Sequence, residues 1–156
     1  MAKSARDKIG EDKPVKITAL PDTLNRWGPP GASMVISTPK EVNAVMASVP
    51  KGKLVTTTEI RAKLSELHGT DITCPLTTGI FTNIAAKAAE EMQELGMPED
   101  QITPYWRCLK TDGELNPKYP GGIEHQASQL EAEGFEIRRK GKRAFVERFE
   151  EKLASI

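Results

Sequence analysis

The sequence predicts an α+β, winged-helix-like fold: a single domain with a helix-turn-helix and a C-terminal β-hairpin, preceded by an extended N-terminal arm. Three observations lead to this prediction. Apolar residues recur at helical spacing in three consecutive segments of the middle of the chain. Polar and apolar residues alternate on both sides of a turn at Gly141, which is typical of a hairpin. The first 38 residues are rich in Lys, Asp, Pro and Gly and show neither pattern.

The length and charge of the chain narrow the classes of protein to consider. The 156 residues are enough for one domain of ordinary size and too few for two independent cores. No apolar run approaches the roughly 18 residues that span a bilayer, and charges occupy the place where a signal peptide is apolar. We therefore expect a cytoplasmic protein with no membrane partner. Lys and Arg total 22, as do Asp and Glu, so only a local cluster of charge could indicate a nucleic-acid partner.

Residues 1–38 are predicted to form the arm, and residues 39–156 the winged-helix domain. Pro29 and Pro30 cannot continue a helix because proline lacks the amide hydrogen and clashes with the preceding turn. Trp27 is expected to pack on the core because a large indole ring is seldom left wholly in water.

Two helices are predicted directly after the arm. The first begins with Thr38 as its cap and ends before Pro50. The second begins at Thr56, because Thr56 and Glu59 have the spacing of a capping box, in which each side chain bonds the other's backbone amide. Gly69 ends this second helix.

The remaining elements complete the predicted fold. A third helix runs from about Thr77 to Gly96, and with the second helix and a tight connection it suggests a helix-turn-helix. Residues 104–122 have the composition of a long ordered loop, which is often functional. A helix over 123–133 and the hairpin over 135–147 follow.

Cys74 and Cys108 are predicted to be free thiols in a reducing compartment, with a disulfide as the alternative. They are 34 residues apart, with no Cys-x-x-Cys pair and no neighbouring His. The sequence therefore predicts no metal site, and no motif in it indicates a cofactor.

The strongest local charge is in residues 138–143, where five of six residues are cationic. At a hairpin tip, such side chains reach a phosphate backbone and release its counterions. On this interpretation Arg138, Arg139 and Lys142 contact DNA. The alternative is a solvated turn whose cations protect a sheet edge; the sequence leaves both open.

The third helix opens with small polar residues. Short side chains allow a helix to approach a DNA groove closely, and hydroxyl and amide groups bond phosphates and base edges. The alternative is that the threonines only cap the helix. The candidate DNA-binding residues here are Thr77, Thr78, Thr82 and Asn83.

A family resemblance begins in the predicted loop. Residues 104–115 resemble the active-site segment of the alkylguanine-DNA alkyltransferases, whose pattern is Pro-Cys-His-Arg, two apolar residues, a short gap, Asp-Gly and Leu. Residues 119–123 and 130–134 are similar to later motifs of that family, and 49–52 and 56–60 to earlier ones. The resemblance covers about residues 40–137 in the correct order. The matching residues of the first segment are Pro104, Arg107, Asp112, Gly113 and Leu115.

The departures from that pattern predict that the chain is not an enzyme. Tyr105 stands at the position of the acceptor Cys, and Trp106 at that of the His beside it. Alkyl transfer needs an activated thiolate, whereas a phenol of pKa about 10 beside an indole supplies neither nucleophile nor base. Glu133 matches the carboxylate that orients the family's His and is expected to act as a structural hydrogen-bond acceptor. Cys108 matches an apolar position, so a buried thiol is expected there.

The pattern is similar to the cysteine-less alkyltransferase-like proteins. That resemblance implies a protein that binds double-stranded DNA, holds a flipped alkylated base and passes it to a repair-protein partner. Thr57 takes the place of the family's groove tyrosine. The family's intercalating arginine falls near Gly79, or at Asn83 or Lys87 in another register of the helix. A winged-helix protein-interaction module with a plugged pocket is one alternative function, and an alkyltransferase using Cys108 is another. The predicted pocket consists of Tyr105, Trp106, Arg107 and Tyr119.

Overall fold

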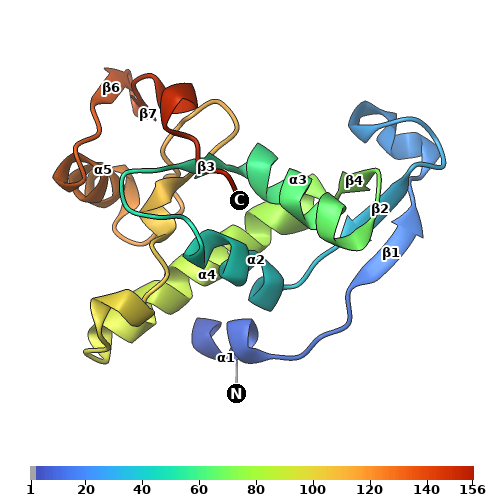
Figure 1. Cartoon of the computed structure of the whole chain (residues 1–156), viewed down its shortest axis with the longest axis horizontal. Coiled ribbons are helices and arrows are strands. Elements are labelled where there is room, and N and C mark those ends of the chain that lie inside the picture. Colours follow the sequence, from blue (N-terminus) through green and yellow to red (C-terminus); the bar gives the residue numbers. More distant parts are fainter. Residues whose placement is uncertain (1–2) are drawn as a thin grey trace.

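The computed structural model describes residues 3–156 and consists of helices and three small sheets (Figure 1). The α-helices are α1 (Ala5–Gly10), α2 (Pro39–Ala47), α3 (Thr57–His68), α4 (Pro75–Glu94) and α5 (Gly122–Ala132). The strands are β1 (Lys16–Ala19), β2 (Ser33–Ile36), β3 (Val55–Thr56), β4 (Ile72–Thr73), β5 (Cys108–Leu109), β6 (Ile137–Lys140) and β7 (Arg143–Val146). The mixed α+β class is confirmed. No helix within residues 3–156 is long and apolar enough to cross a membrane.

The main core lies between α2, α3, α4, α5 and the two sheets β3–β5 and β6–β7. In Figure 1 the long helix α4 runs diagonally through the molecule, from the side where the sheet of β1, β2 and β4 lies to the lower left, and α5 and the hairpin lie at the upper left. Completely buried aliphatic side chains from α2, α3 and the segment at β3 fill the centre of this core: Val42, Met46, Leu54, Val55, Ile60 and Leu64.

Local signals define the first two predicted helices as expected. Thr38 caps α2, and its hydroxyl accepts from the Glu41 amide at 3.1 Å. Thr56 and Glu59 form both bonds of the capping box at the start of α3. Gly69 ends α3 in the left-handed conformation, with φ of 64°. Each of these contacts spans only a few residues, so the sequence alone determines them.

The connection between α3 and α4 differs from the predicted tight turn. It contains β4, which pairs in parallel with β2, so that Met34 lies opposite Ile72 and Val35 opposite Thr73. Helix α4 begins at Pro75, two residues before the predicted Thr77. Proline suits this first helical position because its missing amide hydrogen would have no partner there.

The hairpin and the preceding helix follow the prediction. Strands β6 and β7 pair antiparallel, with Ile137 opposite Val146 and Lys140 opposite Arg143. The loop before α5 is anchored at Gly113, whose φ is 81° and where an added Cβ would lie 2.3 Å from the Phe149 ring. Only glycine fits this close approach.

The predicted conformation of residues 1–38 is wrong for the part that the structure describes. Instead of an extended arm, this segment has the short helix α1 and the strands β1 and β2, which pair antiparallel. Ala5 and Ile9 are buried against Ala88 of α4. Trp27 is half-buried and packs on a small cluster around Leu20, which confirms that its ring meets apolar neighbours. The division of the chain at residue 38 stays a prediction.

Candidate functional site

The segment at the centre of the predicted pocket is a short 3-10 turn, Tyr105–Arg107, that leads directly into β5. Strand β5 pairs in parallel with β3, and Cys108 lies opposite Val55. The turn therefore has strand pairing on one side and Pro104 on the other, which fixes the directions of its three side chains.

A buried carboxylate holds two of these side chains. Trp106 donates from Nε1 to Glu133 Oε2 at 2.6 Å, and Arg107 donates from Nε to Oε1 at 3.0 Å and from Nη2 to Oε2 at 2.9 Å. The Gly52 amide also donates to Glu133 Oε1, at 3.2 Å. Arg107 Nη1 bonds the Val49 carbonyl oxygen at 2.8 Å. The expectation that Glu133 acts as a structural acceptor is confirmed.

The charge state of Glu133 follows from these contacts. Burial by itself would raise the pKa of this carboxyl group. Donation by Arg107, Trp106 and Gly52 outweighs burial, and the pKa lies below its ordinary value of 4.5. Glu133 is therefore an anion at neutral pH, paired with the Arg107 guanidinium. Because it is engaged in this pair, it is not available as a general base for a substrate.

The aromatic rings of the predicted pocket fill it. Tyr105 and Tyr119 are 1% and 3% exposed. Their ring centroids are 5.3 Å apart at 85°, and the Tyr105 and Trp106 rings meet at 5.5 Å and 77°, both favourable edge-to-face arrangements. The three rings thus occupy the volume beside one another, which agrees with the alternative of a plugged pocket. That they hold a flipped base stays a prediction.

The possible nucleophiles in this region are inert. Burial, with a smaller effect of the Glu90 charge, raises the pKa of Tyr105 to about 12. Burial raises the pKa of the Cys108 thiol to about 12 as well, although the nearby Arg107 opposes it. Both Cys108 and Cys74 are buried free thiols, as predicted. A thiol that is fully enclosed and protonated at neutral pH is a poor alkyl acceptor, which argues against the alternative of an alkyltransferase using Cys108.

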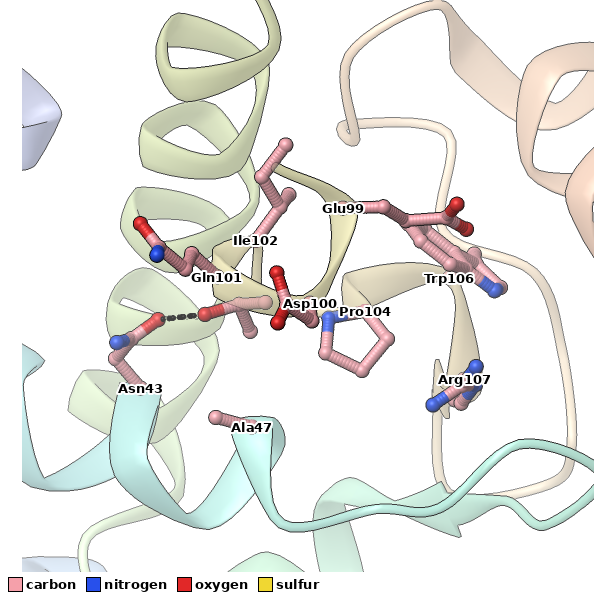
Figure 2. A pocket seen from close by; sticks show the side chains of 10 residues that line it. Asn43, Ala47, Glu99, Asp100, Gln101, Ile102, Pro104, Trp106 and Arg107 are labelled. Carbon is pink, nitrogen blue, oxygen red and sulfur yellow. Dashed lines mark hydrogen bonds between the residues drawn. The ribbon is translucent and has the colours of Figure 1, made fainter. Parts of the chain in front are cut away.

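A groove of about 550 Å³ opens beside the Tyr105–Arg107 turn (Figure 2). We call it the tryptophan groove. Asn43 and Ala47 of α2 line one side, and Trp106 and Arg107 face them from the other. Thr103 donates to Asn43 Oδ1 at 2.8 Å across its floor. Its polar groups come mainly from residues 99–103, and it does not open onto Tyr105 or Tyr119.

A second groove, of about 660 Å³, lies along the first turns of α4, and we call it the α4 groove. Thr57 lines it and is hydrogen-bonded to Thr111 through their hydroxyl oxygens at 3.1 Å. Asn83 also lines it and accepts from Asn116 Nδ2 at 3.1 Å. The structure thus places Thr57 and Asn83, predicted from distant parts of the sequence, on one surface.

Two of the predicted DNA-binding threonines are almost completely buried, although Thr82 is among the residues that line the α4 groove. Thr78 and Thr82 are each 1% exposed, and their hydroxyls donate at 2.8 Å to the carbonyls of Cys74 and Gly79. Burial contradicts a DNA contact by Thr78, because its side chain faces the core and the backbone of the helix satisfies its hydroxyl. A DNA contact by Thr82 stays a prediction. Thr77 is partly exposed and bonds Cys74 through its hydroxyl at 3.4 Å.

The cations of the hairpin are partly neutralised within the molecule. Arg139 forms a two-pronged pair with Glu124, with distances of 2.6 and 2.9 Å. Arg138 lies 3.5 Å from Glu147. Lys142 and Lys140 are exposed and make no ion pair with the described residues. The hairpin therefore offers less free positive charge than its sequence suggests.

Sequence reasoning missed the residue that supports this loop from beneath. Gln126 of α5 is completely buried; it donates to the Trp106 carbonyl at 3.1 Å and accepts from the Asn116 amide at 2.8 Å. The sequence does contain a signal for this role. Gln126 lies on the apolar face of the helix, next to Ala127 and near Leu130, and a polar side chain buried there must form hydrogen bonds within the core. No cluster of three or more His, Cys, Asp or Glu side chains within residues 3–156 is arranged as metal ligands would be.

Comparison with known proteins identifies a fold. No family model and no curated protein sequence matches the chain. The chain is similar to the alkyltransferase-like protein Atl1 of S. pombe, solved in complex with damaged DNA containing O6-carboxymethylguanine. The two are 18% identical, with a TM-score of 0.50, over 76% of this chain and 94% of that chain. S. pombe ATL in complex with DNA matches over the same shares with a TM-score of 0.49. The fold is thus that of Atl1, in agreement with the order of the sequence motifs.

Glu133→Gln tests whether the buried carboxylate stabilises the fold. Removing the anion leaves the Arg107 guanidinium buried without its partner, so we expect the free energy of unfolding at pH 7 to fall by about 3–5 kcal/mol. The contribution of Glu133 is full above pH 4.5 and is lost as the pH falls through its lower folded-state pKa. The variant should therefore lose less stability than the wild type on acidification. Urea denaturation at several pH values measures both effects, and Glu131→Gln, an exposed position on the same helix, is the control.

Tyr105→Ala and Tyr105→Phe test whether the ring is part of the core. The alanine variant should unfold about 3–5 kcal/mol more easily because it leaves a cavity. The phenylalanine variant keeps the ring and should lose less than about 1 kcal/mol. Equal, small losses in thermal and urea denaturation would contradict the packing described above.

Proposed function

We propose that this chain is a non-enzymatic DNA-binding protein that recognises damaged, alkylated DNA without alkyl transfer. One observation carries the proposal: the chain shares its fold with Atl1 over 94% of that protein, and that protein was solved with damaged DNA. The chemistry of the site agrees with it, because the acceptor position holds Tyr105, whose phenol has a pKa of about 12, and the His position holds Trp106, bonded to Glu133.

We infer further that α3 and α4 act as the helix-turn-helix and the hairpin β6–β7 as a wing. Thr57, Thr77 and Asn83 at or near the α4 groove support this arrangement, since all three are at least partly exposed polar residues around one helix end. Lys142 supports a wing contact. Two buried free thiols fit a reducing compartment such as the cytoplasm. A repair-protein partner that receives the complex is also part of the proposal.

A second function is favoured by a different observation. Tyr105, Trp106 and Tyr119 fill the predicted pocket with edge-to-face contacts, and Arg139 and Arg138 are paired with Glu124 and Glu147. Both features are consistent with a winged-helix module that binds a protein partner and lacks a base-binding pocket.

A binding and mass-shift experiment separates these functions. The protein should bind a duplex containing an O6-alkylguanine more tightly than the same duplex without the lesion, in competition at fixed salt. After incubation its mass should be unchanged, and Cys108→Ala should behave identically because the thiol is enclosed and protonated. Addition of one alkyl mass on Cys108 would establish an enzyme instead. Absence of binding to either duplex would favour the protein-docking function.

The salt dependence of DNA binding tests the wing. Lys140→Ala with Lys142→Ala removes cations that have no acidic partner among the described residues. The slope of log affinity against log salt should therefore fall by up to about 0.9 for each phosphate that the variant no longer neutralises. Arg138→Ala with Arg139→Ala should change the slope less, because Glu147 and Glu124 already neutralise these charges. Identical slopes for the wild type and both double variants would place the wing away from DNA.

A further inference from the structure

Two large apolar side chains near the start of α4 are open to solvent. Leu76 is 66% exposed and Ile80 is 50% exposed. Residues four apart on a helix lie on the same face, one turn above the other. Asn83 and Lys87 continue that face, so the exposed side of α4 is a strip that starts apolar and ends polar. We call Leu76 and Ile80 the apolar pair.

Positive charges lie on both sides of this strip. On one side is the α4 groove, which the apolar pair itself lines together with Arg61, Lys110 and Lys118. On the other side, Phe81 and Ile84 of α4 line a further groove with lysines of the N-terminal segment: Lys3, Lys8, Lys13 and Lys16. Glu11 lines this groove too and pairs with Lys3 and Lys13, at 2.6 and 3.3 Å. Lys8 and Lys16 make no ion pair with any residue in the described part of the chain, nor do Arg61 and Lys118.

The acidic residues of the α4 groove do not cancel this charge. Asp112 and Glu114 also line the groove, but Arg143 bonds both, at 3.3 Å to Asp112 and at 2.8 and 2.9 Å to Glu114. The bonds from Arg143, against the effect of burial, hold the pKa of Glu114 below its ordinary value. Lys110 also lies 3.7 Å from Glu114, so Arg143 and Lys110 together offset the two carboxylates. Arg61 and Lys118 remain as the cations of this groove that have no acidic partner among the described residues.

An apolar centre between two cationic margins matches one occupant best, a distorted DNA duplex. Its phosphate strands are anionic on both sides of a groove, and the base pairs between them have apolar faces that become accessible when a step opens. Proteins that bend DNA insert leucine, isoleucine or similar side chains between base pairs in this way. A protein partner would cover the apolar pair but would not require cations on both sides.

We propose that Leu76 and Ile80 enter the base stack of bound DNA as an apolar wedge that opens one base step. This inference rests on the proposed DNA-binding function. In it, these two side chains separate two adjacent base pairs. It also accounts for the solvent exposure of two large aliphatic side chains on a helix whose other aliphatic and alanine positions are mostly covered.

The test compares Leu76→Ala with Ile80→Ala, as a double variant, against a matched control. Leu67→Ala with Leu95→Ala removes two side chains of similar exposure, 55% and 60%, that line neither groove beside α4. The probe is a duplex with 2-aminopurine next to an O6-alkylguanine, because this base fluoresces more strongly when it leaves the stack. Thermal denaturation of each variant confirms that it folds, and the single variant Ile80→Ser is the reserve.

The wild type and the control should raise the fluorescence of the probe on binding, and the wedge variant should not. The wedge variant should bind about tenfold or more weakly, since opening a base step costs a few kcal/mol that the wedge offsets. Its salt slope should be unchanged, because the cations that neutralise the phosphates are all still present.

Three results would overturn the inference. Wild-type affinity and fluorescence in the wedge variant would leave the proposed function intact but remove the wedge. A smaller salt slope in that variant would show that the two residues position phosphate contacts instead. No binding of any duplex by the wild type would overturn the proposed function and the wedge together.

Discussion

The Glu133 carboxylate is the contact on which the rest of the candidate site depends. It lies at the end of α5, its side chain is only 8% exposed, and it collects donors from Trp106, Arg107 and Gly52. Removing a charge from water is costly, and these donors offset that cost only while the segments that carry them stay in place. The end of α5, the Tyr105–Arg107 turn and the turn before β3 are therefore positioned together. Strand β5, which follows the turn, pairs with β3, so this pairing also holds the turn in place relative to the core.

This arrangement also explains why the site has no reactive group. A nucleophile or a general base needs access to a substrate and a pKa near the working pH. Here Glu133 is fully used, Cys108 is enclosed, and Tyr105 is held neutral by burial. No buried side-chain nitrogen or oxygen of residues 3–156 lacks a hydrogen-bond partner. The region around Glu133 therefore has a structural role, and a ligand would contact the surfaces that this region holds in place.

The unpaired positive charge lies beside the outer side of α4 more than on the hairpin. The hairpin has the highest density of cations in the sequence, yet Arg138, Arg139 and Arg143 are paired with acids of the same molecule. Around α4, by contrast, Arg61 and Lys118 face an open groove. Charge that is already paired releases few counterions on binding, so the unpaired cations near α4 matter more for affinity. The N-terminal segment adds to the same side, because Ala5 and Ile9 of α1 pack on α4 and place the lysines that follow beside the exposed strip.

The sequence by itself determined the starts of α2 and α3, the glycine that ends α3, and the hairpin. It also has Tyr105 and Trp106 where the motif that it resembles has Cys and His. These features depend on contacts within a few residues or on residue identity alone. Only the tertiary structure decided that β1, β2 and β4 form a sheet, that Thr78 and Thr82 are buried, and that the arginines of the hairpin are paired. The physical reason is that a two-residue strand such as β4 has no periodic signal, and an ion pair such as Arg139 with Glu124 depends on where two elements pack. Tyr105 illustrates both parts: the sequence supplies a phenol and no thiol at this position, and the tertiary structure packs its ring against Trp106 and Tyr119.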